Sequence, residues 1–324
     1  MLMSWIAFAA GLVLLVGAAE ALVRGAVAMA ERLGVSPLVI GLTVVAFGTS
    51  APELVVCVQA ALEGSGGLVY GNIIGSNIAN IMLILALAAL IRPVQAEMRT
   101  FGREATVLIL ATVAMVVFTW GDGVIRLEGG VLLAALAAYL LWSYIRESRT
   151  AADARAAAAE LEDLSTLQHK PWWMIVGATV VGLGGVILGA RLLVTGAVAI
   201  ARDWGVSEEV IGLTMVAIGT SLPELATAAA AALKKQNDMA LGNVVGSNLF
   251  NILGIMGVSA LVKPAAAPAQ VMAFDAWVML GVTVLLVPFF LTGRRLARVE
   301  GGLLLGGYAA YIAVLFIGVE TLFA

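Results

Sequence analysis

Long apolar stretches separated by short polar breaks run along the whole chain. A helix that crosses a bilayer needs about 20 predominantly apolar residues, and charged residues, glycines and prolines mark off stretches of about that length. The ten predicted helices span residues 2–31, 37–62, 68–91, 104–121, 125–146, 172–201, 208–233, 239–262, 272–292 and 297–319. The pattern therefore predicts an all-α polytopic membrane protein.

Composition supports this class and excludes others. With 62% hydrophobic and 12% charged residues, the 324-residue chain holds more apolar side chains than one soluble core could bury. The net charge of −3 leaves no basic stripe for phosphates, so we expect no nucleic-acid partner. The single cysteine, Cys57, is expected to be a buried hydrophobe, and the single histidine, His169, lies in a polar linker. We therefore expect a protein that is not an enzyme and whose partner is the lipid bilayer.

Two segments of the chain recur. GLTVVAFGTSAPEL at 41–54 matches GLTMVAIGTSLPEL at 212–225, and GNIIGSNIANI at 71–81 matches GNVVGSNLFNI at 242–252, both at an offset of 171 residues. Internal symmetry of this kind indicates two homologous halves of five helices each. Because five is odd, the second half must cross the bilayer in the opposite sense. The predicted organisation is a first inverted repeat at 1–146 with its motifs at about 37–91, a linker at 147–170, and a second inverted repeat at 171–324 with its motifs at about 208–262.

The distribution of basic residues supports the inversion. Most of the 18 Lys and Arg residues fall on one side of the predicted helices, and only Arg126, Arg202 and Lys263 fall on the other. Lys and Arg concentrate in cytoplasmic loops, so the linker is predicted to be cytoplasmic and both termini to lie outside, in a cell (plasma or inner) membrane. At equivalent positions, EGSG at 63–66 is replaced by KKQN at 234–237, as this topology requires.

Two acidic residues, Glu53 and Glu224, occupy matching positions well inside predicted helices. A carboxylate at the bilayer centre costs about 2.5–3.5 kcal/mol, so each must have a role. Pro52 and Pro223 precede them and lack an N–H group, which frees the carbonyl four residues earlier and allows the helix to unwind. Unwound backbone is tolerated at this depth where it is buried or lines a cavity. The two motifs therefore predict interrupted helices around a polar site.

The remaining acidic residues inside predicted helices have simpler explanations. Glu20 is expected to pair with Arg24, four residues later on the same helix. Four others fall at predicted helix starts, where interfacial water and the helix dipole account for them: Glu104, Glu128, Asp275 and Glu300.

Neutral oxygen ligands surround the two glutamates in the helical pattern. Thr49 and Thr220 lie four residues before them on the same face. A polar stripe follows in the next helix of each half: Asn72, Ser76, Asn77 and Asn80, then Asn243, Ser247, Asn248 and Asn251. Helix-to-helix bonding could explain each stripe, but not the presence of carboxylates, hydroxyls and amides in both copies. Oxygen ligands with two carboxylates suit hard cations such as Ca²⁺ or Na⁺. Ca²⁺, Na⁺ and H⁺ would compete for them, because two carboxylates in one site repel each other.

At these motifs the sequence resembles the Ca²⁺/cation antiporter superfamily, particularly prokaryotic sodium/calcium exchangers, whose inverted repeats carry GTSxPE and GSNxxN/D signatures. The resemblance covers essentially the whole chain. It implies a Ca²⁺ site formed by Glu53, Glu224, Thr49 and Thr220, and Na⁺ sites that share these residues and add Ala46, Ser76, Asn80, Ala217, Ser247 and Asn251. No cofactor is implied beyond the transported ions. Many relatives carry aspartate where Asn251 stands, so we do not expect K⁺ dependence.

The sequence thus predicts a secondary active antiporter that extrudes Ca²⁺ against entering Na⁺ by alternating access. An H⁺/Ca²⁺ antiporter is the nearest alternative, and a passive cation channel is an alternative of a different class. A membrane-embedded hydrolase that uses Glu53 and Glu224 as an acid/base pair is a weaker alternative, because no substrate-recognition motif supports it. We expect a monomer.

Overall fold

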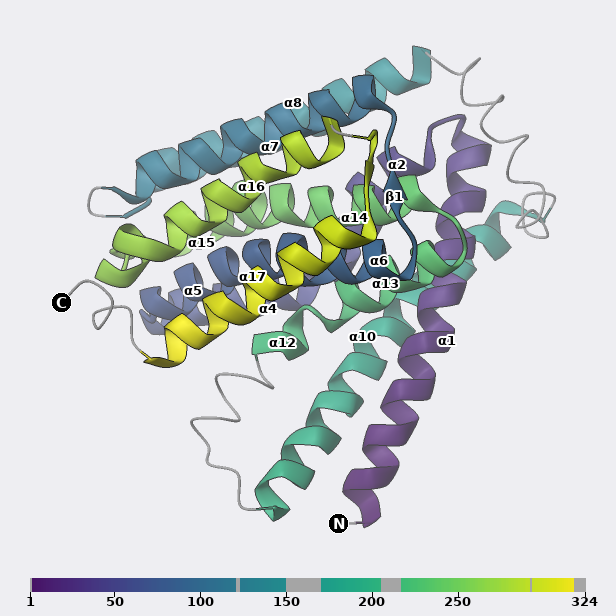
Figure 1. Cartoon of the computed structure of the whole chain (residues 1–324), viewed down its shortest axis with the longest axis horizontal. Coiled ribbons are helices and arrows are strands. Elements are labelled where there is room, and N and C mark those ends of the chain that lie inside the picture. Colours follow the sequence, from purple (N-terminus) through teal and green to yellow (C-terminus); the bar gives the residue numbers. More distant parts are fainter. Residues whose placement is uncertain (1, 121–122, 150–169, 205–216, 292, 318–324) are drawn as a thin grey trace. The chain divides into compact units, whose positions relative to one another are not determined.

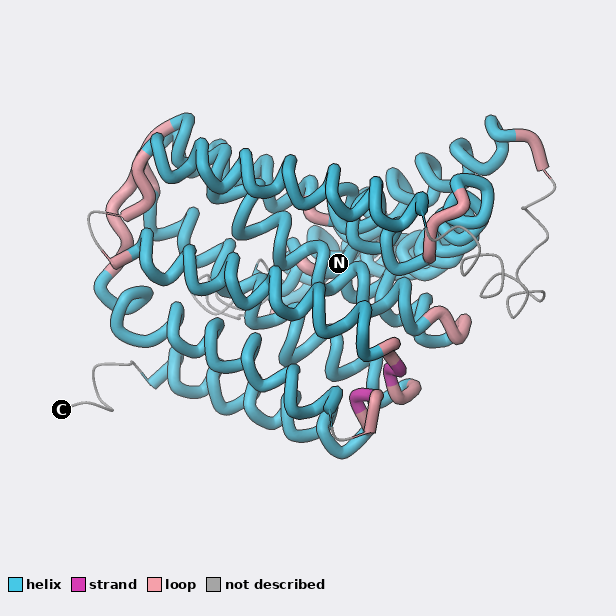
Figure 2. Tube along the Cα trace, turned by 90° about the horizontal axis from the view of Figure 1, so that it is seen from above, coloured by secondary structure: helices cyan, strands magenta, loops and turns pink. Residues whose placement is uncertain are grey.

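The structure is a computed structural model that describes residues 2–120, 123–149, 170–204, 217–291 and 293–317. Nearly all of these residues are helical (Figures 1 and 2). The α-helices are α1 (Leu2–Leu33), α2 (Pro37–Ile40), α3 (Ala46–Thr49), α4 (Ala51–Glu63), α5 (Gly66–Ala79), α6 (Ala86–Ile91), α7 (Met98–Thr119), α8 (Arg126–Arg149), α10 (Trp172–Asp203), α12 (Ala217–Thr220), α13 (Leu222–Leu233), α14 (Asn237–Leu249), α15 (Met256–Val262), α16 (Ala276–Leu291) and α17 (Arg298–Ile317).

Short π-helical turns and one small sheet complete the described elements. The π turns are η1 (Gly41–Val45), η2 (Asn80–Leu85), η4 (Phe250–Ile255) and η5 (Val271–Asp275). The strands β1 (Val94–Gln95) and β2 (Arg295–Leu296) pair antiparallel, with Val94 opposite Leu296 and Gln95 opposite Arg295. The hydrophobic pattern did not predict these strands, because two residues are too short to show a period of two.

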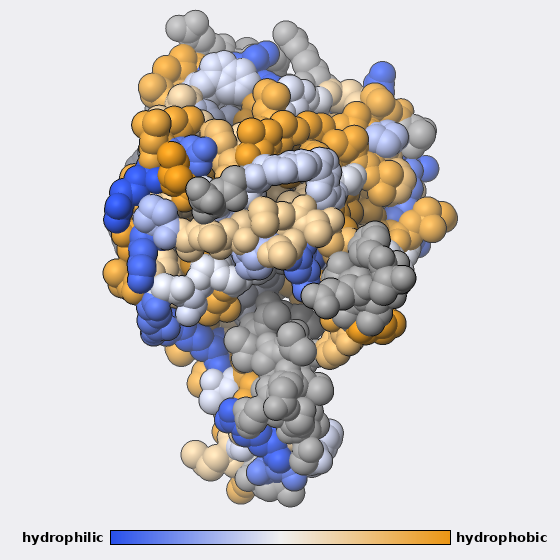
Figure 3. Space-filling view, turned by 90° about the vertical axis from the view of Figure 1, so that its left-hand side faces the viewer, coloured by the Kyte–Doolittle hydropathy of each residue, from blue (hydrophilic) through white to orange (hydrophobic). Residues whose placement is uncertain are grey.

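Eight helices among the described residues are long and apolar enough to cross a membrane, and the bent pair Pro37–Thr49 and Ala51–Glu63 would make a ninth span. Large apolar side chains are exposed on many of these helices, and they cover much of the face in Figure 3. This is the surface expected of helices that face lipid. The predicted all-α polytopic class is confirmed. The predicted helix 208–233 falls partly outside the described residues, so the number ten stays a prediction.

The chain forms two compact units. The first comprises residues 1–52 and 141–243, and the second comprises residues 53–140 and 244–324. Each unit draws elements from both predicted halves, so this division does not test the domain boundaries at 146 and 171. The predicted linker lies largely outside the described residues, which end at Arg149 and resume at Lys170.

The first unit is built on α1 and α10, which lie side by side (Figure 1). Glycines allow the two backbones to meet. A Cβ on Gly189 would lie 2.6 Å from Leu15 N, and one on Gly182 would lie 2.6 Å from Leu22 N. The contacts pair later residues of α10 with earlier residues of α1, so the helices are antiparallel. Such small-residue interfaces are the usual way in which helices pack closely within a bilayer.

The second unit packs helices from both predicted halves against each other. Gly129 of α8 contacts α15, where its Cβ would lie 2.9 Å from Gly257 O, and Gly301 of α17 contacts α6, where its Cβ would lie 2.9 Å from Ala86 O. The phenyl rings of Phe101 in α7 and Phe290 in α16 lie 4.1 Å apart. Gly129 and Gly301 belong to two similar segments, RLEGG at 126–130 and RVEGG at 298–302, so equivalent residues make equivalent contacts.

The arginine and glutamate of these segments also have equivalent roles. Arg126 donates to Leu261 O at 3.2 Å, at the end of α15, and Arg298 donates to Ile91 O at 3.3 Å, at the end of α6. Glu128 accepts the N–H of Ile125 at 2.9 Å, and Glu300 accepts the N–H of Ala297 at 2.6 Å. These bonds satisfy donors at the starts of α8 and α17. The sequence predicted that both glutamates lie at helix starts, but it did not predict these bonds.

Candidate functional site

Both recurring GTSxPEL segments interrupt a helix at the serine. In the first, α3 ends at Thr49 and α4 begins at Ala51, and the two parts form an angle of 47°. In the second, α12 ends at Thr220 and α13 begins at Leu222. Ser50 (φ −84°, ψ 7°) and Ser221 (φ −91°, ψ 5°) have nearly the same backbone conformation. In both copies a proline stands at the second position of the new helix, where its missing N–H costs nothing. The predicted interruption is confirmed.

Glu224 lies in a polar cluster of the first unit. Its side chain is 1% exposed, and its Oε1 accepts a hydrogen bond from the Ser50 hydroxyl at 2.9 Å. The Thr49 hydroxyl lies 3.3 Å from both Asn243 Oδ1 and Ala46 O, and Asn243 Nδ2 donates to the Glu224 carbonyl at 3.3 Å. Residues of the first GTSxPEL motif thus contact the glutamate of the second.

Two glycines explain how Asn243 reaches this cluster. A Cβ on Gly242 would lie 2.5 Å from Leu38 O, and one on Gly41 would lie 3.0 Å from Met239 O. The start of α14 therefore touches the backbone of α2 and η1, which continue into α3. Any larger side chain at Gly242 would force these helices apart.

The second unit holds the amides of the two GSN motifs. Asn80 Nδ2 donates to Asn248 Oδ1 at 2.8 Å, and Asn248 Nδ2 donates to the Asn77 carbonyl at 3.3 Å. Both bonds join one copy of the motif to the other. Four further residues of the predicted site are also buried in this unit: Glu53, Ser76, Ser247 and Asn251.

Several buried oxygen atoms in these two clusters lack a hydrogen-bond partner among the described residues. They are Glu224 Oε2 in the first unit, and Asn77 Oδ1, Asn80 Oδ1, Ser247 Oγ and Asn251 Oδ1 in the second. Leaving a buried polar group unsatisfied costs about 1–3 kcal/mol. Carboxylate, amide and hydroxyl oxygens are the ligands that Ca²⁺ and Na⁺ accept. The unpartnered oxygens of each cluster are therefore of the kind that hard cations accept, and the assignment of these residues to Ca²⁺ and Na⁺ sites stays a prediction.

Asn72 and Thr220 differ from the arrangement that the sequence predicted, and Ser50 was not predicted to take part. Asn72, the first residue of its stripe, donates to Cys57 Sγ at 3.2 Å, and Cys57 is fully buried, as predicted. Thr220 is half-buried, and the side chain of Ala217 lies outside the described set. Ser50 was not assigned to the site, although the recurrence of a hydroxyl before each Pro–Glu pair could have identified it.

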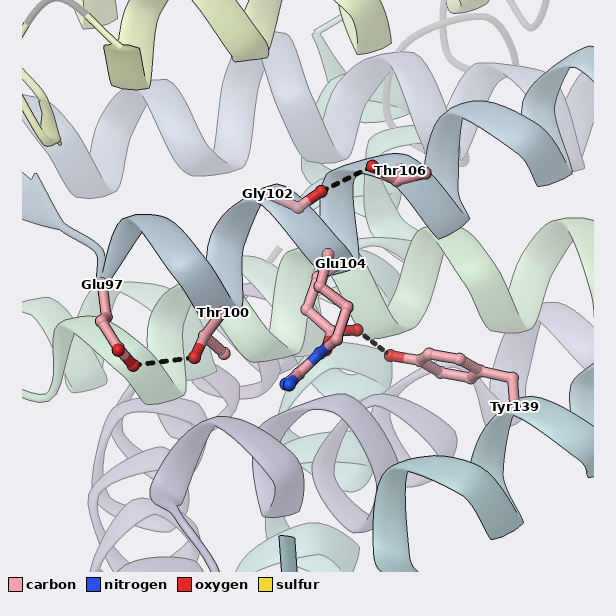
Figure 4. Close-up of polar contacts among 7 residues, drawn as sticks. Glu97, Thr100, Gly102, Glu104, Thr106 and Tyr139 are labelled. Atoms are coloured by element: carbon pink, nitrogen blue, oxygen red, sulfur yellow. Dashed lines mark hydrogen bonds and ion pairs between the residues drawn. The ribbon is translucent and has the colours of Figure 1, made fainter. Parts of the chain in front are cut away.

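The explanation offered for Glu104 and Asp275 from the sequence was wrong. Instead of meeting interfacial water at a helix start, both are buried in the second unit, with 2% and 7% exposure. Glu104 accepts a hydrogen bond from the Tyr139 hydroxyl and pairs with Arg103 Nε at 2.8 Å (Figure 4). Asp275 accepts from the Tyr311 hydroxyl at 3.0 Å and from Gln270 at 3.1 Å. Glu104 lies six residues after the start of α7 at Met98, whereas the predicted helix began at 104.

A profile of the family described as "Sodium/calcium exchanger protein" matches residues 3–145 and 174–317, nearly the whole described chain. The chain belongs to the sodium/calcium exchanger family. It is 38% identical over 319 residues to CaxA of Alkalimonas amylolytica, covering 98% of this chain and 99% of CaxA. It is 31% identical over 337 residues to the sodium/calcium exchanger MaX1 of Methanosarcina acetivorans, covering 94% and 96%.

Solved structures agree with this membership. A structure of the sodium-calcium exchanger NCX_Mj, soaked without Na⁺ and Ca²⁺, superposes with a TM-score of 0.85 at 33% sequence identity and covers 97% of this chain and 99% of that one. The predicted resemblance is thus confirmed. Family membership and the apolar helices make the chain a multi-pass integral membrane protein of an exchanger family, and they support exchange of Ca²⁺ for another cation rather than an enzymatic reaction.

Proposed function

We propose that this exchanger couples entry of Na⁺ to extrusion of Ca²⁺ by alternating access. The observation that carries the proposal is the surroundings of Glu224: a buried carboxylate with one oxygen bonded to Ser50 and the other without a partner among the described residues. A carboxylate left in this condition within a bilayer is stabilised by a cation.

The residues of the proposed site come from the two recurring motifs of the sequence. Glu53 and Glu224 occupy equivalent positions of the two GTSxPEL segments, and this recurrence supports assigning both to the site. The proposed Ca²⁺ ligands are Glu53, Glu224, Thr49 and Thr220. The proposed Na⁺ ligands are the same residues with Ala46, Ser76, Asn80, Ala217, Ser247 and Asn251. One Ca²⁺ ion carries enough charge to neutralise two carboxylates, whereas more than one Na⁺ ion must bind to neutralise them.

The neutral oxygens favour Na⁺ over H⁺ as the coupling ion. A proton needs one carboxylate oxygen, but Na⁺ requires several oxygen ligands around it. The unpartnered atoms Asn80 Oδ1, Asn251 Oδ1 and Ser247 Oγ supply neutral ligands that proton coupling would not use. An H⁺/Ca²⁺ antiporter remains the second candidate because the same carboxylates bind protons.

Ca²⁺ uptake by proteoliposomes tests the coupling ion. Vesicles loaded with Na⁺ and diluted into Na⁺-free buffer at equal pH should accumulate ⁴⁵Ca²⁺, and vesicles with only a pH gradient should not. E53Q and E224Q should each abolish the uptake, while E97Q, which removes an exposed carboxylate, should not change it. Uptake driven by the pH gradient alone would favour the H⁺ alternative. Ca²⁺ flux that needs no counter-ion would indicate a channel.

The proposed topology places both termini outside, the linker in the cytoplasm, and the halves 1–146 and 171–324 in opposite senses. Ser65 and Lys235 are exposed residues in equivalent loops of the two halves. In intact cells, S65C should react with a membrane-impermeant maleimide, and K235C should react only after permeabilisation. Labelling of both from the same side would refute the inversion. We propose a monomer, which mass measurement of the purified protein in detergent would test.

A further inference from the structure

Four exposed arginines of the second unit lie where three candidate membrane spans begin or end. Two of these spans end at Ile91 and Leu291, and the third begins at Arg298. The four residues, called the arginine cluster below, are Arg92, Arg294, Arg295 and Arg298. The cluster therefore lies at the level where the apolar core of a bilayer meets the lipid headgroups.

The small sheet holds the arginine cluster together. Arg295 belongs to β2, which pairs with β1, and the carbonyl of Arg294 accepts the N–H of Ala96 at 3.1 Å. Arg298 Nη2 donates to the carbonyl of the residue before Arg92 at 3.3 Å. These bonds join the segment after α6 to the segment between α16 and α17, so the four arginines share one end of the second unit.

Ion pairs do not neutralise three of these arginines. The exposed acid Glu97, next to β1, accepts a hydrogen bond from Thr100 Oγ1 at 2.8 Å. The side chains of Arg92, Arg294 and Arg295 make no hydrogen bond or ion pair with any residue that the structure describes. Unpaired guanidinium groups gathered in one place create a positive potential that attracts anions.

The similar segment RLEGG at 126–130 shows which of these arginines the shared architecture uses. In both segments the first arginine donates to a carbonyl at the end of a neighbouring helix, as described above. At the offset of 172 residues that relates the two segments, Arg294 and Arg295 correspond in the sequence to Asp122 and Gly123. The equivalent helix contact therefore does not require these two additional arginines.

Exposed aliphatic side chains flank the cluster. Leu291 lies three residues before Arg294, and Val299 directly follows Arg298. Leu291, Val299 and Leu303 are 64%, 74% and 63% exposed. A ligand that contacts both the arginines and these side chains is anionic at one end and apolar at the other. This combination favours an amphiphile over a small soluble anion.

We propose that the arginine cluster binds the headgroup of an anionic phospholipid, whose acyl chains lie along the exposed aliphatic side chains of α16 and α17. Guanidinium groups bind phosphate oxygens through paired hydrogen bonds. A group of four or more basic residues at the end of a membrane span is typical of anionic-lipid sites, and each residue strengthens the attraction about fivefold. The inference goes beyond the proposed antiport and does not depend on the coupling ion.

Lipid binding by the purified full chain, titrated and followed by native mass spectrometry, tests the site. The probes are dioctanoyl-phosphatidylglycerol, which is anionic, dioctanoyl-phosphatidylcholine, which has the same chains and no net charge, and glycerol 1-phosphate, which has no chains. The wild type should bind the anionic lipid more tightly than either other probe. R294Q/R295Q should raise its apparent Kd about 25-fold, because two basic residues are lost. Neither side chain bonds to another described residue, so this variant should fold.

A second pair of variants provides a matched control. R92Q/R298Q should also raise the apparent Kd for the anionic lipid about 25-fold. R126Q/K263Q removes two exposed basic residues from the equivalent positions of the chain, including the equivalent helix contact. It should leave the apparent Kd unchanged, because those positions lack counterparts of Arg294 and Arg295.

Three outcomes would overturn the proposal. Equal affinity of the wild type for the two lipids would show that no anionic-lipid site exists. Equal losses in R92Q/R298Q and R126Q/K263Q would show that any basic residue serves and that the cluster is not the site. Binding of glycerol 1-phosphate as tight as that of phosphatidylglycerol would identify a soluble anion as the ligand. The proposed antiport fails by a separate measurement, if wild-type proteoliposomes show no Na⁺-driven Ca²⁺ uptake.

Discussion

The close contact between α1 and α10 makes a quantitative prediction for the substitution Gly189→Ala. The added Cβ would lie 2.6 Å from Leu15 N, 2.8 Å from Leu15 Cα and 3.1 Å from Gly11 O, whereas ordinary contacts begin at 3.4 Å. These neighbours are backbone atoms of a helix and cannot rotate away, so the two helices must separate by most of an ångström at this point. Overpacking of this kind costs about 1–3 kcal/mol.

Gly184 provides the matched control, because it lies on the same helix and nothing lies within 4 Å of its Cβ position. Alanine is the better helix former at both sites, by about 1 kcal/mol. After this gain is subtracted, thermal unfolding in one detergent, followed by tryptophan fluorescence, should show a midpoint up to about 4 °C below wild type for Gly189→Ala. Gly184→Ala should unfold at or above the wild-type midpoint. Equal midpoints for the two variants would refute the close packing of α1 on α10.

Three further predictions concern other described contacts. Tyr311→Phe removes a donor from the buried Asp275 and should lower the free energy of unfolding by about 1–3 kcal/mol, measured by thermal unfolding; an unchanged midpoint would contradict the contact. Glu300→Ala removes the acceptor at the start of α17 and should cost about 0.5–2 kcal/mol in the same assay, whereas a cost near zero would argue against the cap. Asn248→Ala removes the partner that orients Asn80 and should raise the KM for Ca²⁺ about 10–100-fold in Na⁺-driven uptake, and an unchanged KM would remove Asn80 from the site.

The sequence predicted the helical class and both helix interruptions because these follow from local rules. Apolar length defines a membrane helix, and a proline placed inside a helical pattern ends or bends it. Recurrence of the motif then distinguished Glu53 and Glu224 from other acidic residues. Both features can be found without knowing which helices are neighbours.

Contacts between distant segments could not be predicted in the same way. The pairing of Glu20 with Lys234 and the bond from Tyr139 to Glu104 depend on which helix faces which, and a hydropathy pattern does not encode this. The interpretation of Glu104 was wrong because the predicted helix began at residue 104, whereas α7 begins at Met98. The prediction therefore placed at the helix start a residue that lies inside the helix. Ser50 could have been found, since its hydroxyl stands at a repeated position of an otherwise assigned motif.

The π turn η2 lies between α5 and α6 and changes the direction in which the side chains of α6 point. A π turn contains one residue more than a regular α-helical turn. Side chains after η2 therefore point in a different direction from the one they would have in an uninterrupted α-helix. Asn80, the first residue of the turn, donates to Asn248, and Ala86, directly after the turn, contacts Gly301 of α17. Each residue advances an α-helix by about 100°. Deleting a single residue within η2 would therefore rotate α6 by about 100° relative to Asn80, and α6 would no longer present Ala86 to Gly301 of α17.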